Sequence, residues 1–226
     1  MTNVLVFAGR GRYADQWHDY VATSHAIATA LAGMGLDVTV SSKAIEALAN
    51  LDDIDLLVVN AGHGPVNEDY DGSDAELAPA RAGVDAYLDR AGPVACFHTA
   101  MGSLWDNPRW APLFGAAWVD GQSYHPDLGP CVIETVPGAH RLADGLGDFE
   151  TVDERYSSLA LSRRLEPYLV YQHDGITEPL AWAWEADGRR AVCNTLGHDA
   201  AGYGPGRLEV LRREVDWLLG GDRKDA

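Results

Sequence analysis

The chain has 226 residues, of which 46% are hydrophobic and 23% are charged, an ordinary balance for a globular protein. Its 34 acidic and 17 basic residues give a formal net charge of −17, so we expect neither a nucleic acid nor an anionic membrane as partner, since either requires a concentrated basic face. No stretch is apolar for long enough to cross a bilayer, and the chain does not open on a basic segment followed by an apolar one, which predicts a cytoplasmic protein.

The first half of the chain alternates between short apolar runs and segments with helical patterns. Parallel strands are predicted over residues 4–8, 38–40, 56–59 and 94–97, and the first and last of these are expected to be buried. The helix after the first strand ends at Gly33 and Gly35, and its predicted apolar face consists of Val21, Ile27, Ala28 and Leu31. Two more helices are expected, one capped by Ser42 and running to Leu48, and one from Asp74 to Leu88. This order predicts a parallel sheet with helices on both faces.

The second half is predicted to extend the sheet with antiparallel strands, because most segments between its apolar runs are too short for helices. Short strands are expected at residues 118–119, 131–134, 169–172, 180–184 and 191–194. The last two can pair through a turn at Asp187-Gly188. A final amphipathic helix is predicted over residues 208–218, and the last six residues are polar and expected to fray. No linker divides the chain, so we expect one domain over residues 1–226.

Three cysteines, Cys96, Cys131 and Cys193, occur in apolar runs. Their odd number and wide spacing match neither a disulfide framework nor a zinc-binding pair. We therefore expect reduced thiols in the core.

Polar side chains follow several of the predicted strands, where parallel sheets bind their ligands. His18 with Asp19, His63, His98 and His198 come just after strands, so separate segments can converge on one edge of the sheet. Further candidates are His125, His140, Glu154, Tyr156 and Asp199. Each of these has a plainer alternative: a lone histidine can be an ordinary loop residue, Asp153-Glu154 a solvated turn, and Asp199 a helix cap before two alanines.

The order of these motifs resembles the trehalose-utilisation (ThuA-like) family, a branch of the class I glutamine amidotransferase-like superfamily. The resemblance covers nearly the whole chain. It rests on the start at residues 4–7, His18-Asp19, Phe97-His98-Thr99-Ala100, His125-Pro126, His140 with Gly145-Leu146, Asp153-Glu154 with Tyr156, Leu196-Gly197-His198-Asp199 and Trp217. It implies a flavodoxin-like three-layer α/β sandwich, with a mostly parallel sheet and an antiparallel β extension.

The resemblance also implies a departure from amidotransferase chemistry. In that superfamily a nucleophilic cysteine occupies the corner after the strand that corresponds to residues 94–97. Here His98 falls at that position, and Cys96 lies two residues earlier, inside the strand, where a buried thiol without a basic neighbour is inert. We therefore expect no glutaminase activity.

Three functional hypotheses follow. The first is an enzyme of carbohydrate metabolism, hydrolase- or isomerase-like, as the resemblance implies for trehalose-type disaccharides or their oxidised forms. In it, His98 and His198 act as general acid and base, and Glu154 or Asp199 orients an imidazole. Substrate would be bound by His18, Asp19, His63, His125 and Tyr156, and the aromatic rings of Trp17, Tyr124 and Tyr156 could stack on sugars.

The second hypothesis is a divalent metal site, with zinc as the example and His18, His98, His198 and Glu154 as candidate ligands. The third is a non-catalytic module that binds a sugar or another small molecule at the same edge. A homodimer is compatible with each of them, but the sequence identifies no interface.

Overall fold

The computed structural model describes residues 1–221, so the expected fraying of the last six residues falls, apart from Gly221, outside the described part of the chain. Four parallel strands form the first half of the large sheet, as predicted: β1 (Asn3–Ala8), β2 (Asp37–Ser41), β3 (Leu56–Asn60) and β4 (Val94–Phe97). Five strands extend it: β6 (Gly129–Thr135), β7 (Phe149–Asp153), β9 (Pro167–His173), β10 (Ile176–Ala186) and β11 (Arg189–Asn194).

The nine strands lie in the order β2-β1-β3-β4-β11-β10-β9-β6-β7. β11 runs parallel to β4, and each later pair in this order is antiparallel. The predicted hairpin turn is confirmed: Ala186 pairs with Arg189, and Asp187 and Gly188 between them have φ of 53° and 79°, which type I′ turns require.

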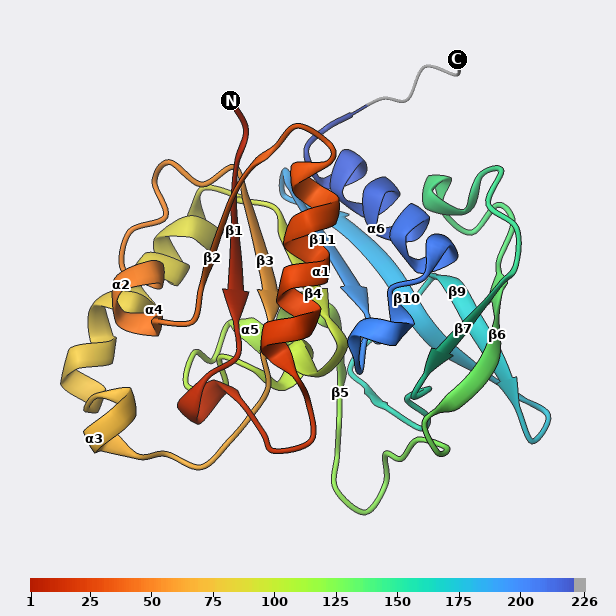
Figure 1. The fold of residues 1–226 in the computed structure, drawn as a ribbon, viewed down its shortest axis with the longest axis horizontal. Helices are drawn as coiled ribbons and strands as arrows, with labels where there is room; N and C mark the ends of the chain where they lie inside the picture. Colours follow the sequence, from red (N-terminus) through yellow and green to blue (C-terminus); the bar gives the residue numbers. More distant parts are fainter. Residues whose placement is uncertain (222–226) are drawn as a thin grey trace.

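Helices cover both faces of the sheet, because residues of each inner strand point alternately to either side. Val4 and Val6 of β1 pack with α1 (Tyr20–Ala32) and α6 (Pro205–Leu218), which lie side by side in front of the strands (Figure 1). Leu5 and Phe7 pack on the other side, with α2 (Ala44–Leu48), α4 (Asp74–Asp89) and α5 (Trp110–Phe114). The result is the expected three-layer sandwich.

Three local predictions are wrong. Val21 is 79% exposed, because the buried stripe that includes Ile27 and Leu31 continues toward the helix start through Ser24, Thr23 and Tyr20. α2 begins after Lys43 without a side-chain cap, so Ser42 is not its cap. Residues 118–119 are not a strand; the short strand β5 is Ala116–Ala117, which pairs with β8 (Ala160–Leu161).

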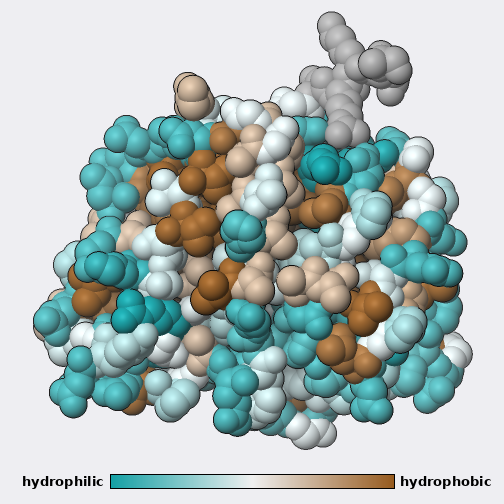
Figure 2. Space-filling view, in the orientation of Figure 1, coloured by the Kyte–Doolittle hydropathy of each residue, from teal (hydrophilic) through white to brown (hydrophobic). Residues whose placement is uncertain are grey.

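The remaining elements are short. They are α3 (Glu68–Asp71) and four 3-10 turns: η1 (Gly11–Tyr13), η2 (His98–Gly102), η3 (Arg141–Ala143) and η4 (Ala200–Gly202). None of the helices within residues 1–221 has the length and apolar composition needed to cross a membrane. Hydrophilic residues are spread over the face seen in Figure 2, and hydrophobic ones form separate groups among them.

Candidate functional site

Four candidate residues gather at one edge of the sheet. One side-chain donor atom from each of His18, His98, Glu154 and His198 lies within 4.8 Å of the other three. His18, His98 and His198 follow the carboxyl ends of β1, β4 and β11, which are parallel. Glu154 follows β7, and the four antiparallel pairings from β11 to β7 reverse direction an even number of times, so β7 ends at the same edge. We call these four side chains the His/Glu cluster.

His98 occupies the corner directly after β4 and is buried. Its backbone has a φ of 50°, an uncommon conformation for a residue other than glycine. Its Nδ1 lies 2.7 Å from the carbonyl oxygen of Thr195, which can only accept, so Nδ1 carries the hydrogen and Nε2 presents a lone pair. Burial, and after it the neighbouring His18, holds the pKa of His98 well below its usual value of 6.5, which keeps this imidazole neutral.

His18 is oriented in the same way by Asp15, a residue that the sequence analysis missed. Nδ1 of His18 lies 2.6 Å from Oδ1 of Asp15, and the hydroxyl of Tyr20 donates to Oδ2 of Asp15 at 2.6 Å. Burial raises the pKa of Asp15, but the hydrogen bonds from His18 and Tyr20 outweigh it and lower that pKa to about 2. Asp15 is therefore a carboxylate, and Nε2 of His18 points at Nε2 of His98, 3.0 Å away.

Glu154 and His198 complete the cluster. Oε2 of Glu154 lies 3.2 Å from Nδ1 of His198 and 3.7 Å from Nε2 of His98, and Oε1 lies 3.6 Å from Nδ1 of His125. Nδ1 of His198 is buried and makes no hydrogen bond within the described residues, although Oε2 of Glu154 lies 3.2 Å away. The Asp153-Glu154 pair is thus buried rather than the solvated turn that the sequence left open.

Asp153 was named from the sequence only as part of the Asp153-Glu154 motif, and the structure gives it a positioning role that was not predicted. Its carboxylate accepts hydrogen bonds from the backbone N–H groups of Gly197 at 2.7 Å, His198 at 3.1 Å and Glu154 at 2.9 Å. It thereby ties together the two loops that carry Glu154 and His198. Burial raises the pKa of Asp153 to about 7, against the effect of these hydrogen bonds. The one feature of the sequence that pointed to Asp153 was its position next to Glu154.

Aromatic side chains line the cluster on one side. The hydroxyl of Tyr156 lies 3.2 Å from Nε2 of His98, and the ring of Trp118 meets the Tyr156 ring edge to face at 4.9 Å. The side chain of His125 is 36% exposed and lies 5.9 Å from the Trp118 ring. Tyr156 and His125, both predicted to bind substrate, are therefore next to the cluster.

Other candidates make different contacts. Asp19 caps α1 through the N–H of Ala22, and Asp199 caps η4 through the N–H groups of Ala201 and Gly202, the alternative noted above for Asp199. The ring of His63 stacks on Trp105 at 5.1 Å. These contacts bring none of the three into the cluster, and their proposed roles stay predictions. The rings of Trp17 and Tyr124 are 70% and 41% exposed, and His140 packs against Trp217.

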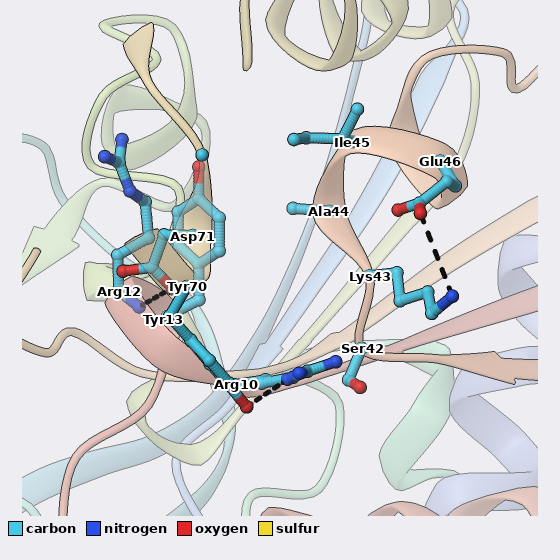
Figure 3. A pocket seen from close by; sticks show the side chains of 11 residues that line it. Arg10, Arg12, Tyr13, Ser42, Lys43, Ala44, Ile45, Glu46, Tyr70 and Asp71 are labelled. Atoms are coloured by element: carbon cyan, nitrogen blue, oxygen red, sulfur yellow. Dashed lines mark hydrogen bonds and ion pairs between the residues drawn. The ribbon is translucent and has the colours of Figure 1, made fainter. Parts of the chain in front are cut away.

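A separate cavity of about 190 Å³ opens at the carboxyl ends of β1 and β2. Its basic residues already have acidic or aromatic neighbours: Lys43 pairs with Glu46 at 3.8 Å, Arg10 bonds the hydroxyl of Tyr70, and the N–H of Arg12 donates to Asp71 (Figure 3). None of the cluster residues lines it.

The cysteine that could serve as nucleophile is placed where it cannot act. Cys96 is fully buried within β4, and its sulfur lies 3.9 Å from that of Cys193. Burial, with the neighbouring thiol, raises the pKa of Cys96 well above its usual value, so the thiolate does not form. Both thiols are free in the core as expected, whereas Cys131 is only half-buried.

The sheet order defines the class of protein, a glutamine amidotransferase-like α/β fold, and a histidine occupies the corner directly after β4. The family model described as ThuA, trehalose utilisation, matches residues 3–218. The chain belongs to this family. A comparison with curated proteins found no significant match.

Solved structures share the fold at low sequence identity. A ThuA-like protein from Parabacteroides merdae aligns with a TM-score of 0.76 and 15% identity, over 100% of this chain and 92% of its own. A glutamine amidotransferase from Thermotoga maritima aligns with a TM-score of 0.57 and 11% identity, over 96% and 98%. Agd3, described as a carbohydrate deacetylase, aligns with a TM-score of 0.59 and 15% identity, over 97% of this chain and 32% of its own.

The buried position of Cys96 leads to a negative prediction. The purified protein is expected to release no ammonia from glutamine above the buffer rate, because no exposed thiolate is available to attack the amide. A coupled glutamate assay at high protein concentration measures this. Glutamine hydrolysis that disappears in Cys96→Ser would contradict the prediction.

Proposed function

We propose that this chain is an enzyme of carbohydrate metabolism and that its reaction takes place at the His/Glu cluster. One observation carries the proposal: three imidazoles and a carboxylate, brought from four separate segments, face one another at the ligand-binding edge of the sheet. Membership of a family described by trehalose utilisation supports a sugar as substrate, and the carbohydrate deacetylase with a related fold is consistent with it.

The chemistry of the cluster suits a polyhydroxylated substrate. Nε2 of His98 and Oε2 of Glu154 accept protons or bind electrophiles, while the hydroxyl of Tyr156 can donate to a sugar oxygen. Because Nδ1 of His98 donates to the carbonyl of Thr195 and burial disfavours the imidazolium form, Nε2 of His98 suits accepting a hydrogen bond or binding an electrophile, and His98 does not suit the role of general acid. The reaction we propose is hydrolysis or isomerisation of a trehalose-type disaccharide or its oxidised form.

A module that binds a sugar without transforming it is the alternative. The left-handed backbone at His98, which costs about 1–3 kcal/mol and which the surrounding structure must enforce, is consistent with an enzyme because it holds a buried imidazole at the ligand-binding edge. Three imidazoles and a carboxylate packed against one another are likewise a poor way to bind a sugar, which needs donors and acceptors spread around its ring.

The test begins with a thermal-shift screen of disaccharides, keto-sugars and sugar acids, followed by mass spectrometry of the products. On a substrate that is turned over, Glu154→Gln is expected to lower kcat by about 100-fold or more, the usual effect of losing a group that transfers protons. Glu68→Gln, the same change on an exposed helix position, serves as the control and should leave kcat unchanged. Ligands that bind without any product, or an unaltered kcat in Glu154→Gln, would overturn the proposal.

A further inference from the structure

We propose that the His/Glu cluster binds one divalent transition-metal ion, with zinc as the best match, through His18, His98, His198 and Glu154. This deepens the proposed function by naming a cofactor for the same site. Binding of the ion itself does not depend on which substrate the enzyme takes.

The spacing of the donor atoms is close to that of a zinc site. In a tetrahedral zinc site with bonds of about 2.0–2.1 Å, neighbouring ligand atoms lie about 3.4 Å apart. The separations here are 3.0 Å between Nε2 of His18 and Nε2 of His98, 3.2 Å between Glu154 and His198, and 3.7 Å between Glu154 and His98. These three separations bracket the expected value, and all four donor atoms lie within 4.8 Å of one another, so the side chains need to draw together to place one ion at bonding distance from all four.

The lone pairs of the cluster point toward one another, which favours a cation between them. Asp15 and the carbonyl of Thr195 hold the Nδ1 hydrogens of His18 and His98, so both Nε2 atoms present lone pairs to each other at 3.0 Å. Two acceptors at that distance repel unless a cation lies between them. A single extra proton shared by these nitrogens would relieve that pair alone, and Nδ1 of His198 would still be buried without a hydrogen-bond partner. One metal ion satisfies every one of these atoms.

The residues around the donor atoms hold the ligands in the way that is usual for metal sites. Metal-binding histidines usually donate their other N–H to a carboxylate or a backbone carbonyl, which fixes the ring and its tautomer. Asp15 plays this part for His18 and the carbonyl of Thr195 for His98, while Asp153 holds the backbone of His198 and Glu154. Tyr20 bridges Asp15 and Thr99, so Asp15 is itself held in place.

The donor set favours zinc over other common ions. Three imidazole nitrogens and one carboxylate oxygen suit zinc and its neighbours in the first transition row, whereas magnesium and calcium prefer oxygen ligands alone. The side chains of His18, His198 and Glu154 are 10–14% exposed, so the site is reached from solvent. An ion that takes the lone pair of His98 also releases the Tyr156 hydroxyl, 3.2 Å away, to hold a sugar oxygen beside it. With four protein ligands, the metal would polarise a substrate oxygen or activate water only by accepting it as a fifth ligand.

The test uses the full chain, purified without a histidine tag and stripped with a chelator. Isothermal titration with Zn²⁺ is expected to show one equivalent bound, and Co²⁺ should give the visible absorption of a four- or five-coordinate site. Because each ligand contributes strongly to affinity, His98→Ala should weaken Zn²⁺ binding by about 100-fold or more. His25→Ala, an exposed histidine of α1, is the matched control and should bind like the parent.

Glu154→Gln, which keeps the shape of the side chain, repeats the test in case His98→Ala does not fold. Less than stoichiometric binding, or equal affinity in both variants and the parent, would overturn the proposal. The two proposals fail separately: zinc bound at the cluster with no sugar transformed rejects only the enzyme function. Sugar turnover in a protein that binds no stoichiometric zinc rejects only the metal site.

Discussion

Replacing Glu214 by alanine is expected to lower the free energy of unfolding by about 3–5 kcal/mol. Glu214 and Arg207 are both completely buried in α6 and form an ion pair at 3.2 Å. Glu214 also accepts hydrogen bonds from the hydroxyl of Tyr168 and from the side-chain amide of Asn194, both at 2.6 Å. The alanine variant leaves the Arg207 guanidinium buried without this partner, and an uncompensated charge inside a protein is costly.

Urea unfolding followed by circular dichroism measures the effect, and the double variant Arg207→Met/Glu214→Leu is the informative control. Because it removes both charges and fills the space with apolar atoms, it should recover most of the stability that Glu214→Ala loses. A loss below about 1 kcal/mol in Glu214→Ala, within the range of ordinary substitutions, would show that the pair is not what holds α6 on the sheet.

This network also supports the candidate site. The Arg207 guanidinium lies 4.9 Å above the ring of Phe97, the residue just before His98. It is one of the positive charges that act on the carboxyl of Asp153. α6 therefore packs against the corner of β4 and lies close to the loops that carry the cluster.

The second large effect is expected for Asp153→Asn, which should weaken zinc binding by about 10–100-fold without changing any ligand. The carboxylate of Asp153 accepts three backbone N–H bonds, from Gly197, His198 and Glu154. An asparagine of the same size turns an NH₂ group toward one of these donors, so at least one bond is lost and the loops of His198 and Glu154 can separate. Asp153 is a positioning residue, and its effect reaches the ion through those two ligands.

Titration of the stripped variant with Zn²⁺, next to urea unfolding of the same sample, tests this prediction. Asp199→Asn is the matched control, since Asp199 also accepts backbone N–H groups nearby but caps η4. It should lose a little stability and keep the zinc affinity of the parent. If Asp153→Asn and Asp199→Asn had the same zinc affinity, Asp153 would be a structural residue only.

Much of the fold could be predicted because it follows from local patterns. The apolar runs at residues 4–8, 56–59 and 94–97 are strands because a fully buried parallel strand needs apolar residues on both faces. The turn at Asp187-Gly188 could be predicted from its residue types alone. Whether Val21 is buried could not be predicted, because an apolar residue at the start of a helix can lie on the buried or on the exposed face. In the structure Tyr20 is buried and Val21 is exposed.

The candidate site divides in the same way. His18, His98 and His198 stood out because they directly follow predicted strands, and Glu154 because it belongs to a family motif. Asp15 and the positioning role of Asp153 could not be recognised, since an acidic residue in a loop is usually solvated and nothing local marks it as buried. Their importance comes from partners such as His18, three residues away, and His198, far along the chain.

The sequence by itself determined the parallel β/α order, the family and the residue types available to the site. These depend on residue type and on short spacings. Only the tertiary structure decided that the donor atoms meet. β7 ends at the same edge of the sheet as β4 because of successive antiparallel pairings, which no local sequence pattern predicts. It also decided which nitrogens face each other, since the carbonyl of Thr195 and the carboxylate of Asp15 set the two tautomers. Convergence and lone-pair direction are properties of long-range contacts, and they turn a set of polar loop residues into a candidate metal centre.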